Sequence, residues 1–430
     1  MNETGKSAGS PMGLDSVNFD NRCGHFPATN EQEELFAWLI DAGLKGGTVR
    51  ELFTEFCERL NSQGVRLKRG NIALSAIHPQ VSAFMYTWRR GEGLVTNTNF
   101  LHSEEPGEGW FASPFFFMLT NKLTFLHRSL NDEAELDFPV LVDFRKQGLT
   151  DWFCQIFDFG WGFESQTLER SAGLITSWAS DRPGGFSEEE FRILSRTIPV
   201  FGLAAKGIAS FRTARSVLET YIGRETAQKV LSGQIRRGSV DSINAVLVYA
   251  DLRGFTSLTD ATGQGDLVEM LDQYLDFMAC PIEDAGGEIL KFMGDGLLAT
   301  FELSSMEPDD IQRICETALR AAEKMMSGVA ELNEKRQQSR QPTMGLDIAL
   351  HVGEVMYGNV GSETRLDFTV IGPAVNEVSR IEALCDVLDT SLIASGDFVR
   401  AAREAGTALT SCGFHELRGV REPIELFCHG

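Results

Sequence analysis

The sequence predicts an α+β fold, and three observations in its C-terminal half support this prediction. An apolar run without charge, Asn244–Ala250, is typical of a strand buried on both faces of a sheet. Apolar residues between Leu267 and Met278 recur at spacings of three and four, which indicates an amphipathic helix. Two strand-like runs, 288–293 and 297–301, are joined by Gly294-Asp295-Gly296, which is typical of a tight turn.

The order of elements narrows the fold further. A second helix is expected over Asp309–Arg336 and a strand over Met344–His351, so residues 244–352 read β-α-β-β-α-β. This is the ferredoxin-like pattern, an antiparallel sheet with helices on one face. The remaining expected elements are a glycine-marked hairpin at Gly353–Gly361, a strand at Leu366–Ile371, a helix opened by Pro373, and a hairpin over 414–427.

The N-terminal half shows a different succession of elements. A helical pattern over 31–62 breaks at Gly43–Gly47, several strand-like runs follow, and 91–114 has the composition of a long loop. Ser187 with Glu190 is typical of a helix N-terminus, and Pro199 should kink or break that helix. This order resembles a GAF-type sensory domain.

Aromatic residues are frequent in the same half. Some of them are candidates to line a ligand pocket, although most are expected to pack in the core. They are Phe84, Tyr86, Trp88, Trp110, Phe111, Phe115, Phe116, Phe117, Trp152, Phe153, Phe157, Phe159, Trp161 and Phe163.

Length, charge and cysteine content exclude several classes of protein. The 430 residues should form two or three domains, and a net charge of −22 argues against a large nucleic-acid surface. Residues 1–30 show no signal peptide, and the longest apolar stretch, Ile198–Phe211, is too short to span a bilayer. Eight cysteines without a CxxC pair favour reduced thiols in a cytoplasmic protein. Cys23 and His25 alone are a weak metal signal.

Two acids stand where neighbouring strands would bring them together. Asp251 follows the buried strand and Asp295 lies in the hairpin turn. Two carboxylates with few basic partners repel each other, and bound Mg²⁺ or Mn²⁺ is the ordinary remedy. Backbone N–H groups from Leu252 to Thr256, a run that includes Gly254 and Phe255, can hold the phosphates of a nucleotide. The sequence contains no Walker A motif and no kinase loop set.

Three runs in this half resemble the class III nucleotidyl cyclase catalytic domain. They are Tyr249–Thr256 (YADLRGFT), Lys291–Gly296 (KFMGDG) and Phe368–Arg380 (FTVIGPAVNEVSR). The resemblance implies a catalytic domain, which is expected over 239–430. Composition and element order predict that a tail (1–30), a GAF-like domain (31–186) and a helical linker (187–238) precede it. The resemblance also implies a homodimer in which the metal acids come from one subunit and the other groups from its partner.

The resemblance also implies a role for each matching residue. Asp251, Leu252 and Asp295 would hold two Mg²⁺ or Mn²⁺ ions per site. Lys291 and Thr369 would select adenine, as in the subgroup with a lysine–threonine pair. Asn376 would orient the ribose and Arg380 would stabilise the transition state. Arg418 and Arg421 are either further contacts to the triphosphate or solvated surface residues.

The function expected on this basis is a sensor-regulated adenylate cyclase that converts ATP to cyclic AMP and pyrophosphate. A guanylate cyclase would carry glutamate and cysteine where this chain has Lys291 and Thr369. A diguanylate cyclase is disfavoured because Gly286-Gly287-Glu288 is not followed by Glu-Phe. A protein that only senses nucleotide remains the third alternative. The signal received by the N-terminal domain is not evident from the sequence.

Overall fold

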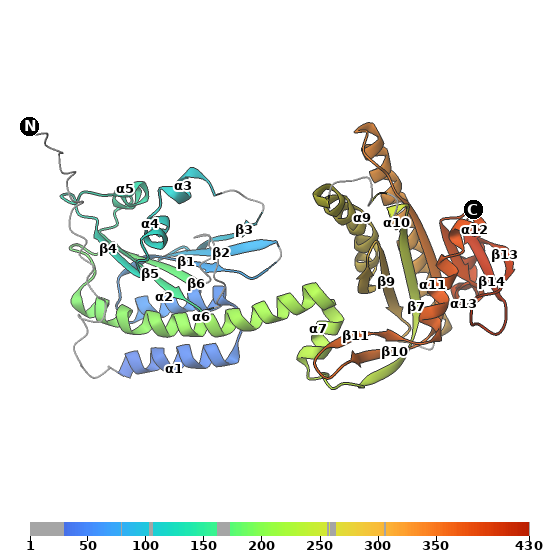
Figure 1. The fold of residues 1–430 in the computed structure, drawn as a ribbon. Coiled ribbons are helices and arrows are strands. Elements are labelled where there is room, and N and C mark those ends of the chain that lie inside the picture. Colours follow the sequence, from blue (N-terminus) through green and yellow to red (C-terminus); the bar gives the residue numbers. More distant parts are fainter. Residues whose placement is uncertain are drawn as a thin grey trace, which may run out of the picture. The chain divides into compact units, whose positions relative to one another are not determined.

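The computed structural model describes residues 30–78, 80–102, 106–160, 173–255, 258, 264–304 and 307–429. The chain divides into two compact units, Met1–Val217 and Leu218–Gly430 (Figure 1). Some residues named above lie outside the described ranges: Cys23, His25, Trp161, Phe163 and Thr256. The predicted tail, up to residue 29, lies outside them too.

The N-terminal unit is built on one antiparallel sheet of six strands. Their order across the sheet is β3-β2-β1-β6-β5-β4. The strands are β1 (Leu67–Ser75), β2 (Val81–Arg89), β3 (Gly93–Leu101), β4 (Phe125–Ser129), β5 (Asp151–Asp158) and β6 (Gly173–Ser180).

Helices cover both faces of this sheet (Figure 1). On one face, α1 (Asn30–Lys45), α2 (Val49–Ser62) and α6 (Glu188–Ile222) enclose an aromatic core. Within this core, Trp178 meets Phe56 edge-on, with ring centroids 5.7 Å apart. On the other face, α4 (Pro114–Thr120) and α5 (Pro139–Lys146) bury a second cluster. The predicted capping box is confirmed, because Glu190 accepts the Ser187 backbone N–H at 2.7 Å.

The expectation of a loop at 91–114 is wrong, and of the kink or break expected at Pro199 the break does not occur. The predicted loop at 91–114 contains β3 and the short helix α3 (Glu108–Phe111). Because β3 is an edge strand, only one side of it pairs and most of its positions face solvent, so its composition resembles that of a loop. The helix α6 continues through Pro199 and ends before Gly223, whose φ of 82° is left-handed.

The C-terminal unit holds a second sheet, with strand order β13-β14-β12-β10-β7-β9-β8 and β11 paired to β10. The predicted β-α-β-β-α-β order is confirmed, although β12 joins β10 in parallel, so the sheet is mixed. The strands are β7 (Val240–Arg253), β8 (Glu288–Met293), β9 (Gly296–Glu302), β10 (Gly345–Gly361), β11 (Leu366–Ile371), β12 (Leu392–Ser395), β13 (Leu409–His415) and β14 (Ile424–His429).

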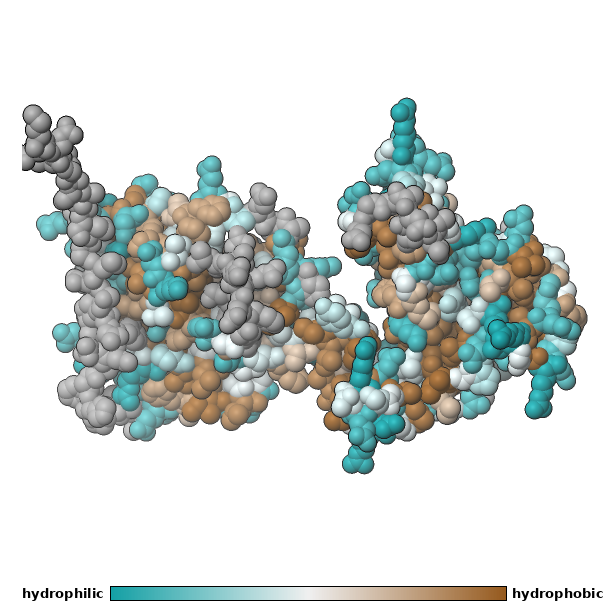
Figure 2. Space-filling view, in the orientation of Figure 1, coloured by the Kyte–Doolittle hydropathy of each residue, from teal (hydrophilic) through white to brown (hydrophobic). Residues whose placement is uncertain are grey.

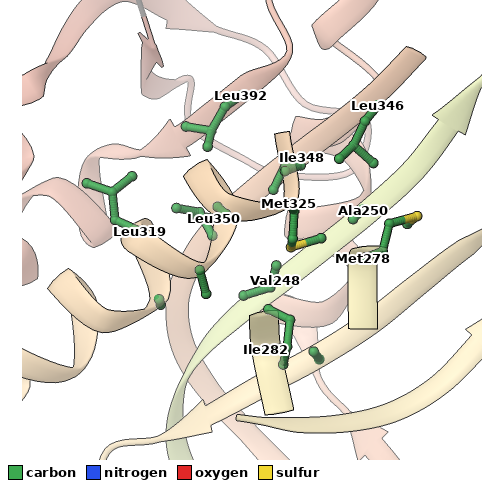
Figure 3. Close-up of a cluster of buried hydrophobic side chains, with 14 of the residues drawn as sticks. Val248, Ala250, Met278, Ile282, Leu319, Met325, Leu346, Ile348, Leu350 and Leu392 are labelled. Carbon is green, nitrogen blue, oxygen red and sulfur yellow. The ribbon is translucent and has the colours of Figure 1, made fainter. Parts of the chain in front are cut away.

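Helices lie on both faces of this sheet as well. The two helices of the β-α-β-β-α-β segment share one face, as expected, but later helices cover the other face. One face carries α9 (Gln264–Asp284), α10 (Pro308–Gln338) and α13 (Gly396–Ala402). Figure 3 shows how side chains of α9 and α10 meet those of β7 and β10 there. The other face carries α11 (Pro373–Glu382) and α12 (Cys385–Leu388). Shorter elements are α7 (Arg224–Leu231) and a 3₁₀ helix at Arg403–Ala408.

The prediction of a hairpin within Gly353–Gly361 is wrong. Strand β10 runs without a break from Gly345 to Gly361, and the turn follows it. The glycines serve close packing instead. A Cβ on Gly353 would lie 2.5 Å from Ala374 Cβ of α11, and one on Gly358 would lie 2.2 Å from the Ser239 carbonyl oxygen. The predicted final hairpin is present as β13 and β14.

The cysteines depart in part from the expectation of reduced thiols. Cys412 and Cys428 form a disulfide across β13 and β14, with Cα atoms 6.1 Å apart. Spacing along the chain did not reveal this pair, because the strand register brings the two residues together. The other cysteines of the described ranges are free. Cys57, Cys154, Cys315 and Cys385 are buried and Cys280 is exposed. None of the described helices has the length and apolar character needed to cross a membrane.

Candidate active site

The two predicted metal acids meet where β7 and β9 pair. The register places Asp251 opposite Gly296, and Asp295 precedes Gly296 in the two-residue turn between β8 and β9. Gly294 opens this turn with a φ of 72°, as a type II′ hairpin requires. A Cβ at Gly296 would lie 2.4 Å from Asp251 Oδ1, so any larger residue there would displace the carboxylate.

Negative charge is concentrated around Asp251. Burial, followed by the charges of Asp295 and Asp347, raises the pKa of Asp251 to about 6. Asp347 of β10 stands directly opposite Asp251 in the strand register. Burial and the same acids raise the pKa of Glu382, at the end of α11, to about 7. Sequence reasoning missed Asp347 and Glu382, since neither position indicates by itself that it faces Asp251.

One of these acids is neutralised within the chain. Arg253 Nε donates to Asp347 Oδ2 at 3.0 Å and lies 3.3 Å from an Asp386 oxygen. In the described part of the chain, no basic side chain lies within 4 Å of Asp251 or Asp295. Both carboxylates are therefore available to a cation.

The donor set fits Mg²⁺ or Mn²⁺ only together with a nucleotide. Among the described residues, no group of three or more His, Cys, Asp or Glu side chains is arranged to hold a metal ion. Mg²⁺ is usually held by one or two carboxylates plus substrate phosphates, so Asp251 and Asp295 suffice for that mode. The Leu252 side chain is buried in the core, and only its backbone can contribute. Gly254, with a φ of 94°, and Phe255 follow it.

The predicted base-selecting residues lie on neighbouring strands. Lys291 is on β8 and Thr369 is on β11, and these two strands contact each other. Thr369 is only 8% exposed, yet its hydroxyl has no hydrogen-bond partner among the described residues. A buried hydroxyl without a partner is costly, so a ligand that hydrogen-bonds to it would be stabilised.

Asn376 and Arg380 share helix α11, as predicted. The helix is fixed by its buried apolar face and by Glu377, whose Oε2 lies 3.2 Å from Nε2 of the buried His351. Asn376 is exposed. The Arg380 guanidinium lies beside Gly419, where an added Cβ would be 3.6 Å from Nη1. No carboxylate of the described ranges lies within 4 Å of this guanidinium. Arg418 and Arg421, in the same loop as Gly419, are exposed.

A cavity in the N-terminal unit is the counterpart of the predicted ligand pocket. It measures about 360 Å³ and is lined partly by Phe111, Phe116 and Phe117. These are three of the aromatic candidates from the sequence. Others, including Trp152 and Phe153, are fully packed in the core. The structure therefore divides the aromatic set between packing and a cavity.

Comparison with known proteins finds a family model and several relatives that are similar to the C-terminal part of the chain. Residues 239–428 match the model of a family described as "Adenylate and Guanylate cyclase catalytic domain". An adenylate cyclase of Anabaena cylindrica is 34% identical over 168 residues, which cover 37% of this chain and 32% of that protein. An uncharacterized protein of Mycobacterium tuberculosis is 28% identical over 227 residues, 53% of this chain and 38% of the relative. The chain thus spans about a third of the length of these relatives.

Solved structures are also similar to part of the chain. A bacterial light-regulated adenylyl cyclase is 22% identical, with a TM-score of 0.45, over 53% of this chain and 64% of that one. The guanylyl cyclase Cya2 is 28% identical, with a TM-score of 0.38, over 44% of this chain and 92% of that one.

Proposed function

We propose that this chain is an adenylate cyclase, since residues 239–428 match the model of the adenylate and guanylate cyclase catalytic domain. The ribose 3′-oxygen of ATP attacks the α-phosphorus, the bond from this phosphorus to the bridging oxygen breaks, and pyrophosphate leaves with cyclic AMP as the product. The observation that carries the proposal is the meeting of Asp251 and Asp295 at the β7–β9 edge, without basic partners in the described ranges.

Each candidate residue has a separate role in this reaction. Two divalent ions held by Asp251 and Asp295 would neutralise the triphosphate and favour ionisation of the 3′-hydroxyl. Backbone N–H groups after Leu252 bind phosphate oxygens. Asn376 orients the ribose, and Arg380 stabilises the charge that develops on the α-phosphate.

The pair Lys291 and Thr369 favours ATP over GTP. A lysine ammonium only donates hydrogen bonds, and adenine N1 is an acceptor whereas guanine N1 carries a hydrogen. The unpartnered Thr369 hydroxyl can accept from the exocyclic amine of adenine. Guanylate cyclase activity is the second candidate, because the matched family covers both substrates.

We further propose that two copies of the chain share each active site. Within one chain, Glu382 lies near Asp251, whereas Arg380, two residues earlier on α11, lies beside Gly419. Arg380 therefore reaches the acids most simply from a second copy. Exposed apolar residues on α1 (Ile40, Leu44) and α6 (Leu203, Phe211) offer a surface for self-association. Figure 2 shows apolar surface over these two helices.

The arrangement along the chain supports a further part of the proposal, namely that residues 31–186 form a GAF-like domain that regulates the cyclase. Helix α6 leaves the N-terminal unit and α7 enters the C-terminal one. A sensor can act on a two-chain site by favouring one arrangement of the dimer over another. The cavity at Phe111, Phe116 and Phe117 is a candidate place for its ligand.

The test is product analysis by mass spectrometry. Purified full-length protein with Mg²⁺ or Mn²⁺ should form cyclic AMP from ATP, and cyclic GMP from GTP much more slowly. Asp295→Ala should lower the rate at least about 100-fold, because the site then lacks one of its two acids. A protein that binds ATP but forms no cyclic nucleotide would be a nucleotide sensor. A turnover in Asp295→Ala equal to that of the natural protein would refute the metal assignment.

A further inference from the structure

Helix α7, the last helix before the catalytic sheet, is joined to that sheet by a buried polar network. Its members are Thr226 of α7, Glu288 at the start of β8, and Tyr357 of β10. Thr226 and Tyr357 are only 1% and 3% exposed. Burial raises the pKa of the Tyr357 hydroxyl, which stays protonated and acts as a donor. Buried polar groups of this kind are stable only when each finds a partner.

Three hydrogen bonds converge on the Glu288 carboxylate. Oε1 accepts from the Thr226 backbone N–H at 3.0 Å and from its hydroxyl at 3.1 Å. Oε2 accepts from the Tyr357 hydroxyl at 2.7 Å, and the two hydroxyl oxygens are 2.8 Å apart. The N-cap residue of α7 is Gly223, which has no side chain to cap the helix. Glu288 therefore supplies from β8 the cap that α7 lacks.

The same network contacts the two strands that carry the base-selecting pair. Glu288 begins β8, three residues before Lys291. The ring of Tyr357 packs edge-on against Phe368, with centroids 4.8 Å apart, and Phe368 precedes Thr369 on β11. Lys229 of α7 lies 4.1 Å above the Tyr357 ring and completes the contact. A displacement of α7 therefore acts on both strands.

We propose that Thr226 is a positioning residue for the nucleotide base, and this inference rests on the proposed cyclase function. Its hydroxyl and N–H fix Glu288 and Tyr357, and these fix β8 and β11 so that Lys291 and the Thr369 hydroxyl face one base. Through these hydrogen bonds, the position of α7 would affect the affinity of the site for the base. Contacts to the base are the same in the bound substrate and in the transition state, so their loss raises KM more than it lowers kcat.

The test compares three variants of the full-length chain. Thr226→Val removes the hydroxyl at nearly constant shape, Thr226→Ser keeps it, and Tyr357→Phe removes the second hydroxyl but keeps the ring. For Thr226→Val and Tyr357→Phe we expect KM for ATP to rise about three- to tenfold, with kcat within about twofold and a lower preference for ATP over GTP. Thr226→Ser should behave as the natural protein.

Thr390→Val is the matched control. The Thr390 hydroxyl bonds to backbone oxygens of Leu392 and His429, away from β8 and β11, so KM should not change. A Thr226→Val protein with unchanged KM and unchanged ATP preference would overturn the inference. So would a reduced kcat at constant KM, which indicates only a smaller folded fraction.

The failure of the inference can be told from the failure of the proposed function. If the natural protein forms no cyclic nucleotide, the cyclase function is wrong, and the dissociation constant of a fluorescent ATP analogue replaces KM as the readout. A constant raised in Thr226→Val and normal in Thr226→Ser then supports the positioning role. An equal constant in both variants refutes it.

Discussion

The two units have similar architectures, since each has one sheet with helices on both faces, but they differ in their buried polar groups. In the N-terminal unit such groups mostly pair internally, as Asn71 does with Thr87 at 2.8 Å and Trp152 with Ser177 at 2.9 Å. The exceptions among its described residues are neutral groups, including the indole N–H groups of Trp88 and Trp178 in the aromatic core and the amide oxygen of Gln155. In the C-terminal unit, Asp251 and Asp295 lie together without a basic partner in the described ranges, and the buried Thr369 hydroxyl has no hydrogen-bond partner there.

This difference explains why a function can be inferred for the C-terminal unit in more detail than for the N-terminal unit. Polar groups that satisfy one another stabilise a fold and need no ligand. Two acids that repel each other at the ends of neighbouring strands are stabilised when a cation binds between them. A buried hydroxyl without a partner is likewise stabilised by a ligand that hydrogen-bonds to it. The C-terminal unit therefore indicates a chemistry, whereas the N-terminal unit offers a cavity whose ligand is unidentified.

Of the three tests of this comparison between the units, we expect the largest effect when the base-selecting residues are replaced. Lys291→Glu with Thr369→Cys should raise the rate with GTP relative to ATP by about tenfold or more, because mismatched polar groups in a dry site cost about 1–3 kcal/mol. The measurement is kcat/KM for both nucleotides. Lys324→Glu, at an exposed position of α10, is the control for the charge change. An unchanged ratio would show that the base is recognised elsewhere.

A smaller effect is expected on the stability of the metal-free protein. The raised pKa of Asp251 means that the folded state disfavours its ionised form, so this residue costs stability once the pH rises above about 4 toward 6. In EDTA at pH 8, Asp251→Asn should therefore melt about 2–4 °C higher, equivalent to about 1 kcal/mol after solvent screening. At pH 4 the difference should vanish.

The same two proteins are then melted in the presence of Mn²⁺ and ATP in place of EDTA. The ligands should raise the melting temperature of the natural protein and leave that of Asp251→Asn nearly unchanged. A variant that is less stable than the natural protein in EDTA at pH 8 would contradict the assigned charge repulsion.

The smallest effect is expected from changing the link between the units. Two residues inserted after Arg215 rotate the following part of α6 by about 200°, whereas seven inserted residues nearly restore the phase. The first insertion should change the basal cyclase rate at least about twofold, and the second should change it less. Rates are compared over a range of protein concentrations. Equal rates for all three proteins would refute control by the N-terminal unit.

Much of the C-terminal fold could be predicted because its strands and helices have clear periods. The buried run at Asn244–Ala250 and the turn at Asp295 placed the two acids correctly. The error at Gly353–Gly361 has a physical cause, since glycine permits close packing as well as turns. Likewise, β3 was missed because an exposed edge strand has the composition of a loop.

The site could be predicted residue by residue only where a motif contains it. Lys291, Thr369, Asn376 and Arg380 lie in such runs, and the structure places them on the expected elements. Asp347 and Glu382 could not be found, because their approach to Asp251 depends on strand register and on how α11 packs. The same holds for Thr226, whose partners are 62 and 131 residues away in the chain.

The central claim, that two copies of this chain share each active site, is tested most directly by complementation. Asp251→Ala and Arg380→Ala should each be nearly inactive. In an equal mixture with random pairing, half of the dimers are mixed and each has one intact site, so about a quarter of the natural activity should return. Asp251→Ala mixed with Asp295→Ala, defects in the same half-site, should recover none. If mixed dimers form and no activity returns, the shared site is contradicted.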